Sequence, residues 1–390
     1  MNDRERFHAT MHYLPRDRCP IMDFRFWEET RVIWQEQGLP KDANTDVFFG
    51  MDQQWIGAPI AISLRPAFQH TVIEDRGDVW IVQDEEGVTK EQGKFLGSIP
   101  KMLDHKLKDR ESWEKEFKWR LDGANSDRYP KDWDAQVAEY NRPDRDYPLG
   151  IHTGSLYGWL RNWMGVEALS LLVYDDPGLF QEMVETVTTC IVTAITPALE
   201  AGIKFEYANM WEDMCYRAGP LLSPRMFKQV LVPNYKRITS LLKRYGVDVV
   251  IVDCDGDISK LAPLWLEAGV NTMFPIEIGV WGADPIAYRR EYGKDMLMIG
   301  GISKRLLAGS KDAIKSEVER LAPLVEEGGF IPTPDHLLPP DVPLDNYMYY
   351  LQEARRVWGK ELANLKPMGE LTTNASTRRN ITRYAANFQV

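Results

Sequence analysis

The sequence has no apolar run close to the roughly 20 residues that a membrane-spanning helix needs. It also lacks an excess of basic residues: 47 Lys and Arg stand against 58 Asp and Glu, a formal net charge of −11. Proteins that bind nucleic acid need a basic face, so this balance argues against such a partner. Residues 1–6 lack the apolar core of a signal peptide. These absences predict a cytoplasmic protein that binds neither membranes nor nucleic acid.

Several common site signatures are also missing. There is no G-x-G-x-x-G motif, no P-loop and no H-x-C zinc pattern. Only four cysteines occur in 390 residues, none in a C-x-x-C pair, which predicts reduced thiols. A site in this chain must therefore be assembled from residues that are distant in the sequence.

From residue 148 onward the sequence alternates between short apolar runs and amphipathic segments. Asp-Pro or Ser-Pro pairs precede several of the amphipathic segments, and glycines follow them, as expected for capped helices. Repeated βα units predict an α/β fold, either a parallel barrel or an open doubly wound sheet. Pro233 is expected to kink or split the helix over 224–245. The predicted strands are 149–152, 203–208, 249–253, 271–275, 296–300 and 329–331, with a seventh at 19–24 and an eighth not located.

Residues 41–147 have a different pattern. Segments 68–74, 78–83 and 88–90 predict an antiparallel meander, and charged helical segments follow at 111–121 and 133–140. We therefore predict one barrel domain over 1–390 in which 41–147 is an insertion.

The most distinctive stretch is Asp253, Asp255 and Asp257 directly after a buried strand. Carboxylates this close repel each other unless a metal, a cationic neighbour, a shared proton or solvent offsets the charge. In barrels, the residues that carry chemistry lie at the carboxyl ends of the strands. We assign Asp253 and Asp255 to a functional site and Asp257 to a helix cap.

Polar residues follow the other predicted strands as well. Glu212, Asp255, Glu277 and His336 are suitable ligands for a divalent metal such as zinc, although helix capping and loop hydrogen bonds are the alternative for each. Cys254 is a soft ligand or, as we favour, a packing residue. Lys304 and Arg305 could hold a substrate carboxylate, or begin a solvated helix. The remaining candidates for substrate contact are His152, Trp159, Trp163 and Trp211.

These segments together resemble the uroporphyrinogen decarboxylase superfamily, and most closely its methyltransferases that serve corrinoid proteins. The motifs are residues 4–7 (RERF), 158–165 (GWLRNWMG), 212–214 (EDM), 219–224 (GPLLSP), 252–257 (VDCDGD), 300–305 (GGISKR) and 334–342 (PDHLLPPDV). The resemblance implies a distorted (β/α)8 TIM-type barrel with its site at the carboxyl ends of the strands.

Two departures narrow the activity that the resemblance implies. Residues 21–27 (IMDFRFW) lack the arginine-rich signature of the decarboxylases, which argues against a porphyrinogen substrate. Asp253 stands where the thiol-methylating relatives have the histidine of an H-x-C zinc motif.

The resemblance then implies transfer of a methyl group from a small substrate, such as a methoxylated aromatic, to the cobalamin of a separate corrinoid protein. The expected catalytic residues are His336, Asp255, Asp253 and Glu212. A cofactor-free decarboxylase of a small carboxylic acid and a non-catalytic binding protein are the alternatives, and a homodimer stays open.

Overall fold

The computed structural model describes residues 1–94 and 100–359, which form two compact units. Of the described residues, unit 1 comprises Met1–Ile56, Asp144–Leu149 and residues 271–359. Unit 2 comprises Gly57–Pro143 and Gly150–Val270. The predicted insertion 41–147 does not coincide with either unit, and a single barrel domain over the whole chain stays a prediction.

Unit 1 contains three parallel strands in the order β12-β11-β10. Their bounds are β10 Thr272–Ile276, β11 Leu297–Ile302 and β12 Phe330–Pro334. The α-helices of this unit are α1 Asp3–Met11, α2 Glu28–Glu36, α3 Thr45–Phe48, α12 Ile278–Trp281, α13 Pro285–Tyr292, α14 Lys304–Leu307, α15 Lys311–Glu327 and α16 Leu344–Trp358.

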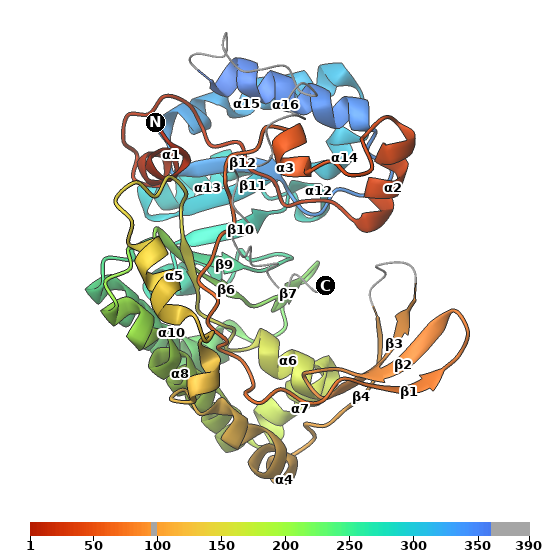
Figure 1. Cartoon of the computed structure of the whole chain (residues 1–390), viewed down its shortest axis with the longest axis vertical. Coiled ribbons are helices and arrows are strands. Elements are labelled where there is room, and N and C mark those ends of the chain that lie inside the picture. The colour runs from red at the N-terminus through yellow and green to blue at the C-terminus, as the bar shows by residue number, and fades with distance from the viewer. Residues whose placement is uncertain (95–99, 360–390) are drawn as a thin grey trace. The chain divides into compact units, whose positions relative to one another are not determined.

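Unit 2 contains the parallel strands β5, β6 and β9 in the order β9-β6-β5, a two-stranded hairpin and a four-stranded meander (Figure 1). The strands are β1 Thr71–Asp75, β2 Val79–Gln83, β3 Val88–Gly93, β4 Lys101–His105, β5 Gly150–His152, β6 Tyr207–Trp211, β7 Cys215–Tyr216, β8 Gly219–Pro220 and β9 Val250–Asp253. The α-helices are α4 Arg110–Ser112, α5 Trp133–Tyr140, α6 Gly158–Met164, α7 Val166–Asp175, α8 Pro177–Glu200, α9 Pro224–Met226, α10 Val232–Arg244 and α11 Ala262–Glu267.

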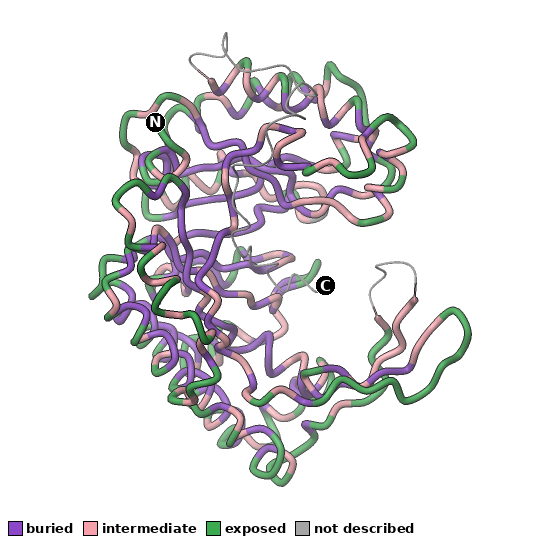
Figure 2. Tube along the Cα trace, viewed as in Figure 1, coloured by how far each residue is buried: buried purple, intermediate pink, exposed green. Residues whose placement is uncertain are grey.

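The α/β fold class is as predicted, and the six strands predicted after residue 148 are all present. Strands β9 to β12 are buried along their whole length, as their mostly apolar sequences indicate (Figure 2). Strand β6 begins four residues later than predicted, because residues 203–206 connect α8 to the strand.

The predicted strand at 19–24 is wrong. Its backbone bonds partly to side chains: Ile21 N–H donates to Asp52 Oδ2 (3.3 Å) and Asp23 N–H to Gln54 Oε1 (2.9 Å). Beyond this stretch, Arg18 and Phe26 form single bridges to Gly359 and Leu338. The segment is extended and buried but does not join a ladder.

The expected helix punctuation is confirmed. Asp176, Ser223 and Asp284 each accept a hydrogen bond from a backbone N–H in the first turn of the helix that follows. Pro233 splits its helix: α9 is followed by a π-helical turn over Phe227–Leu231, and α10 begins at Val232. The wider turn lies just before the proline, which lacks the N–H that a continuous helix would need.

None of the helices in the described part of the chain combines the length and apolar character needed to cross a membrane.

The predicted meander is present as β1-β2-β3-β4, with one strand more than expected. Its β2–β3 turn carries Glu86, whose side chain contacts Asn162 and Trp163 of α6. Burial, followed by the negative charge of Asp84, raises the pKa of Glu86 to about 7. The turn therefore holds a carboxyl group that titrates near neutral pH.

We expect the protein to lose stability as the pH rises from 4.5 to about 7, because the folded state keeps a proton on Glu86 that the unfolded state releases. Glu86→Gln should remove this dependence and raise the free energy of unfolding at pH 8 by about 1–3 kcal/mol. Urea titrations at pH 5 and pH 8 measure the effect. Glu85→Gln, at the exposed neighbouring position, is the matched control. Equal pH dependence in Glu86→Gln and the parent protein would contradict the prediction.

Candidate active site

The ends of β6 and β9 bring two acidic segments together in unit 2. The register of the parallel pair places Trp211 opposite Asp253, and Glu212 N–H donates to the Asp253 carbonyl oxygen (2.8 Å). Residues 212–213 and 253–255 therefore leave the strands side by side. This is the edge at which barrel enzymes place their catalytic groups.

Asp213, Asp253 and Asp255 form a carboxylate group whose ligand oxygens all lie within 4.8 Å of one another. It is the one such group of three His, Cys, Asp or Glu side chains among residues 1–94 and 100–359. Asp253 is buried, while Asp213 and Asp255 are half-buried. Asp253 and Asp255 were predicted from the sequence, but Asp213 was not.

The backbone and one arginine hold the carboxylate group in place. Asp255 N–H donates to Asp213 Oδ1 (3.2 Å), and Arg161 Nη2 of α6 lies 3.8 Å from Asp213 Oδ2. Asp213 has a φ of +38°, a left-handed conformation that aspartate tolerates better than most residues. Gly256 has a φ of +90°, and a Cβ there would lie 2.6 Å from the backbone of Cys215. The left-handed turns at Asp213 and Gly256 shape the two loops that carry the three carboxylates.

The chemistry of this donor set suits a divalent cation. Carboxylate oxygens lie about 2.0–2.6 Å from Mg²⁺ or Ca²⁺, so oxygens up to about 4–5 Å apart can share one ion. An oxygen-only set favours Mg²⁺ or Mn²⁺ over zinc, which prefers nitrogen and sulfur ligands. Cys254 lies next to this group. Its pKa is raised well above the usual value of a thiol, mainly by burial and secondly by the contact with Cys215, in keeping with a packing role.

Glu212 is buried and accepts hydrogen bonds from the start of α6. Its Oε1 accepts from Leu156 N–H (2.8 Å) and the Tyr235 hydroxyl (2.6 Å). Its Oε2 accepts from the Ser155 hydroxyl and from the N–H groups of Tyr157 and Gly158, at 2.9–3.1 Å. Burial raises the pKa of Glu212, and these hydrogen bonds act in the opposite direction. With both oxygens committed to five donors, Glu212 anchors the start of the helix rather than joining the carboxylate group.

The predicted substrate-contact residues of unit 2 differ in exposure. Trp163 is fully buried and stacks on Trp159, with ring centroids 6.0 Å apart, and Trp159 meets the edge of His152 at 6.4 Å. Burial lowers the pKa of His152 to about 4, so its ring is neutral at pH 7. Trp211 is half-buried, and the Arg161 guanidinium lies 5.1 Å from the centre of its ring. Trp211 is thus the tryptophan of these three that is best placed to meet a ligand.

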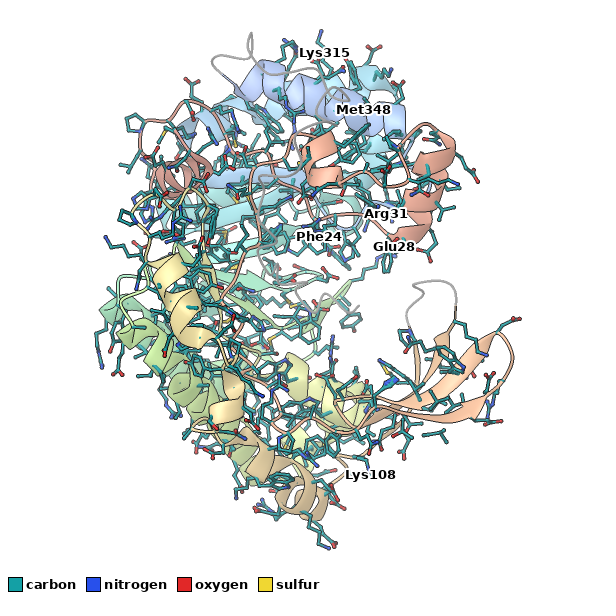
Figure 3. The ribbon with its side chains drawn as sticks, viewed as in Figure 1. Phe24, Glu28, Arg31, Lys108, Lys315 and Met348 are labelled. Atoms are coloured by element: carbon teal, nitrogen blue, oxygen red, sulfur yellow. The ribbon has the colours of Figure 1, made fainter. Side chains whose placement is uncertain are left out.

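The remaining predicted residues lie in unit 1. Glu277 is buried and accepts a hydrogen bond from the Trp281 indole. His336 is buried and stacks on Phe24, with ring centroids 4.8 Å apart (Phe24 is labelled in Figure 3). A common cavity for these two residues with Glu212 and Asp255 stays a prediction, because the latter pair belongs to unit 2.

Two cations begin α14 beside a buried carboxylate. Asp335 accepts from Lys304 N–H (2.9 Å) through one oxygen and from Ile278 and Gly279 N–H (3.1 and 2.9 Å) through the other, so it anchors the starts of α12 and α14. Lys304 is half-buried and Arg305 is exposed, and neither forms an ion pair within the described ranges. Both side chains can therefore receive an anionic ligand.

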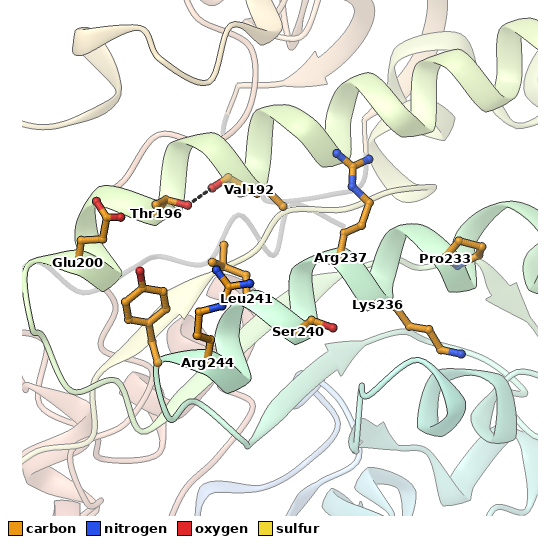
Figure 4. Close-up of a pocket in the computed structure, with 10 residues that line it drawn as sticks. Val192, Thr196, Glu200, Pro233, Lys236, Arg237, Ser240, Leu241 and Arg244 are labelled. Atoms are coloured by element: carbon orange, nitrogen blue, oxygen red, sulfur yellow. Dashed lines mark hydrogen bonds between the residues drawn. The ribbon is translucent and has the colours of Figure 1, made fainter.

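A groove of about 580 Å³ lies between α8 and α10 (Figure 4). Its lining includes Lys236, Arg237 and Arg244 opposite a single acid, Glu200. In a βα unit, the second half of a helix runs toward the amino end of the next strand. The groove therefore lies away from the strand ends that carry the carboxylate group, and we do not assign it to the candidate active site.

Residues 160–357 match the family model described as uroporphyrinogen decarboxylase (URO-D). Similar curated proteins include the uroporphyrinogen decarboxylases of Acidiphilium cryptum (26% identical) and Synechocystis (20% identical). Each match covers 49% of this chain, and the chain spans about half the length of these relatives, 51% and 52%.

Among solved structures, a methyltransferase from Methanosarcina mazei is similar in fold, with a TM-score of 0.56 and 14% identity. The likeness covers 91% of this chain and 98% of that one, and it supports the TIM-type fold. The family model spans more than half of the sequence and includes both strand ends that form the carboxylate group. The chain therefore belongs to the uroporphyrinogen decarboxylase family, whose members are enzymes.

Proposed function

We propose that this protein transfers a methyl group from a small methylated substrate, such as a methoxylated aromatic, to the cobalamin of a separate corrinoid protein. The observation that carries the proposal is the carboxylate group of Asp213, Asp253 and Asp255 at the ends of β6 and β9. An alkoxide or phenolate leaves poorly from a neutral ether, so the reaction needs an acid or a Lewis acid at the departing oxygen. The similarity in fold to a methyltransferase adds support.

The three aspartates would hold a divalent cation, which would supply Lewis acidity when bound. Arg161 offsets part of the negative charge at Asp213 and keeps that side chain in place. Trp211, held by the same arginine, offers a ring face on which an aromatic substrate can stack. Lys304 and Arg305 are proposed to hold a substrate carboxylate, and His336 to donate a proton to the departing oxygen.

His336→Ala should lower kcat by about 10²–10⁴-fold and leave KM within about two-fold, because the charge on the departing oxygen develops only in the transition state. The assay mixes the protein with a reduced corrinoid protein and methoxylated aromatics or methylamines, and follows the cob(I)alamin absorbance. His70→Ala, at the exposed position just before β1, is the control. Full activity in His336→Ala would remove the acid role from this residue and leave the reaction class standing.

A cofactor-free decarboxylase is the second candidate. The curated relatives named above are decarboxylases, and Lys304 and Arg305 are two cations that could bind the carboxylate that leaves. Release of carbon dioxide from a small carboxylic acid, with no methylation of cobalt by any donor, would replace the first proposal with this one.

A further inference from the structure

Three bulky residues of unit 1, Tyr13, Arg25 and Trp55, have left-handed backbone conformations. Trp55 has a φ of +54° and Arg25 a φ of +79°, a region that side chains of this size rarely adopt. Such a conformation costs on the order of 1–2 kcal/mol, and asparagine or glycine would adopt it at lower cost. The surrounding structure must therefore hold Trp55 in place.

A set of hydrogen bonds, which we call the Asp23 clamp, holds Trp55 in its left-handed conformation. Asp23 and Gln54 bond reciprocally: Asp23 N–H donates to Gln54 Oε1 (2.9 Å), and Gln54 Nε2 donates to Asp23 Oδ1 (3.2 Å). The Tyr347 hydroxyl donates to Asp23 Oδ2 (2.8 Å), and the Trp55 indole N–H donates to the Asp23 carbonyl oxygen (3.0 Å). Asp23, Gln54 and Tyr347 are at most 3% exposed. The clamp fixes the indole ring as well as the backbone.

The indole ends a row of four rings, which we call the aromatic row. Trp55 packs on Phe274 (ring centroids 5.0 Å apart), Phe274 on Phe24 (4.8 Å), and Phe24 on His336 (4.8 Å). Phe24, Phe274 and His336 are buried, whereas Trp55 is half-buried. The row therefore connects the proposed acid to one partly exposed, rigidly held aromatic ring.

We propose that Trp55 determines substrate specificity by offering its indole as a stacking surface for a planar aromatic substrate. The proposal rests on the proposed function, in which His336 acts on the same substrate. Filling space in a core would not require a tryptophan on a left-handed backbone. A ring held by the Asp23 clamp loses little freedom when a ligand stacks on it, which favours binding.

The test compares two methyl ethers that each carry a carboxylate: 4-methoxybenzoate, which has an aromatic ring, and methoxyacetate, which has none. Trp55→Leu should weaken binding of 4-methoxybenzoate, measured calorimetrically, by about 10-fold or more and leave methoxyacetate within two-fold. Trp55→Phe, which keeps a ring, should stay within about three-fold for both. Where turnover occurs, KM for the aromatic ether should rise while kcat is retained. Trp119→Leu, on an exposed face of unit 2, is the control.

Thermal denaturation of each variant separates a folding defect from a binding defect. If Trp55→Leu does not fold, a loss of more than about three-fold for 4-methoxybenzoate in a folded Trp55→Phe would contradict the inference. Equal losses for both ethers, an unchanged affinity for 4-methoxybenzoate in Trp55→Leu, or no binding of that ether by the parent protein would overturn the inference. If 4-methoxybenzoate binds in a Trp55-dependent way but no cobalt is methylated, the proposed function fails and the role of Trp55 stands.

Discussion

Replacing Glu212 with alanine should lower the free energy of unfolding by about 3–5 kcal/mol. The side chain is fully buried, and its two oxygens accept hydrogen bonds from five donors. Removing the carboxylate leaves those donors buried without an acceptor at the start of α6. The penalty for unmatched buried donors exceeds the modest net value of each bond, so this is the largest stability effect that we expect.

Graded variants make the explanation testable. Tyr235→Phe removes one donor and should lower the free energy of unfolding by about 1–2 kcal/mol. Glu212→Gln places an amide N–H₂ against backbone and hydroxyl donors, so its loss should lie between those of Tyr235→Phe and Glu212→Ala. Chemical denaturation measures all three. Glu167→Ala, an exposed acid in the first turn of α7, should change stability by about 0.5 kcal/mol or less. If Glu212→Ala keeps the parent stability but loses activity, Glu212 belongs to the catalytic group as the sequence suggested.

The second large effect concerns the carboxylate group. At 100–1,000 times the dissociation constant of a divalent cation, the parent protein should gain about 2.7–4.1 kcal/mol of stability. Asp253→Asn and Asp255→Asn should lose most of this gain, because each removes one of three anionic ligands. In EDTA the same variants should be as stable as the parent protein or slightly more stable, since repulsion between the carboxylates is relieved.

Thermal melts in EDTA and after addition of Mg²⁺, Mn²⁺ or Zn²⁺ measure this effect without requiring a substrate. Asp257→Asn is the matched control, because Asp257 lies two residues further on and accepts from Ser259 N–H (3.0 Å) outside the group. Identical melting of the parent protein in EDTA and in all three cations would contradict the prediction. The carboxylates would then rely on Arg161 or a shared proton instead.

The strand pattern after residue 148 could be predicted because its signals are local. The buried parallel strands β9, β11 and β12 are mostly apolar, and caps and glycines mark the helices between the strands. The 19–24 segment is also mostly apolar, but hydrogen bonding with distant partners decides whether an apolar segment becomes a strand. Its backbone instead bonds to the side chains of Asp52 and Gln54, about 30 residues away.

The sequence by itself therefore determined the βα rhythm, the family motifs and the presence of acids after β6 and β9. Tertiary structure decided which acid anchors a helix and which joins the carboxylate group. Glu212 and Asp213 are neighbours of the same chemical type, yet Glu212 points into the core beneath α6 while Asp213, on its left-handed backbone, joins Asp253 and Asp255. The role of Trp55 likewise depends on a clamp from Asp23 and Tyr347, residues separated by more than 300 positions. Side-chain direction at a strand end depends on packing against distant segments, and no local sequence pattern encodes that packing.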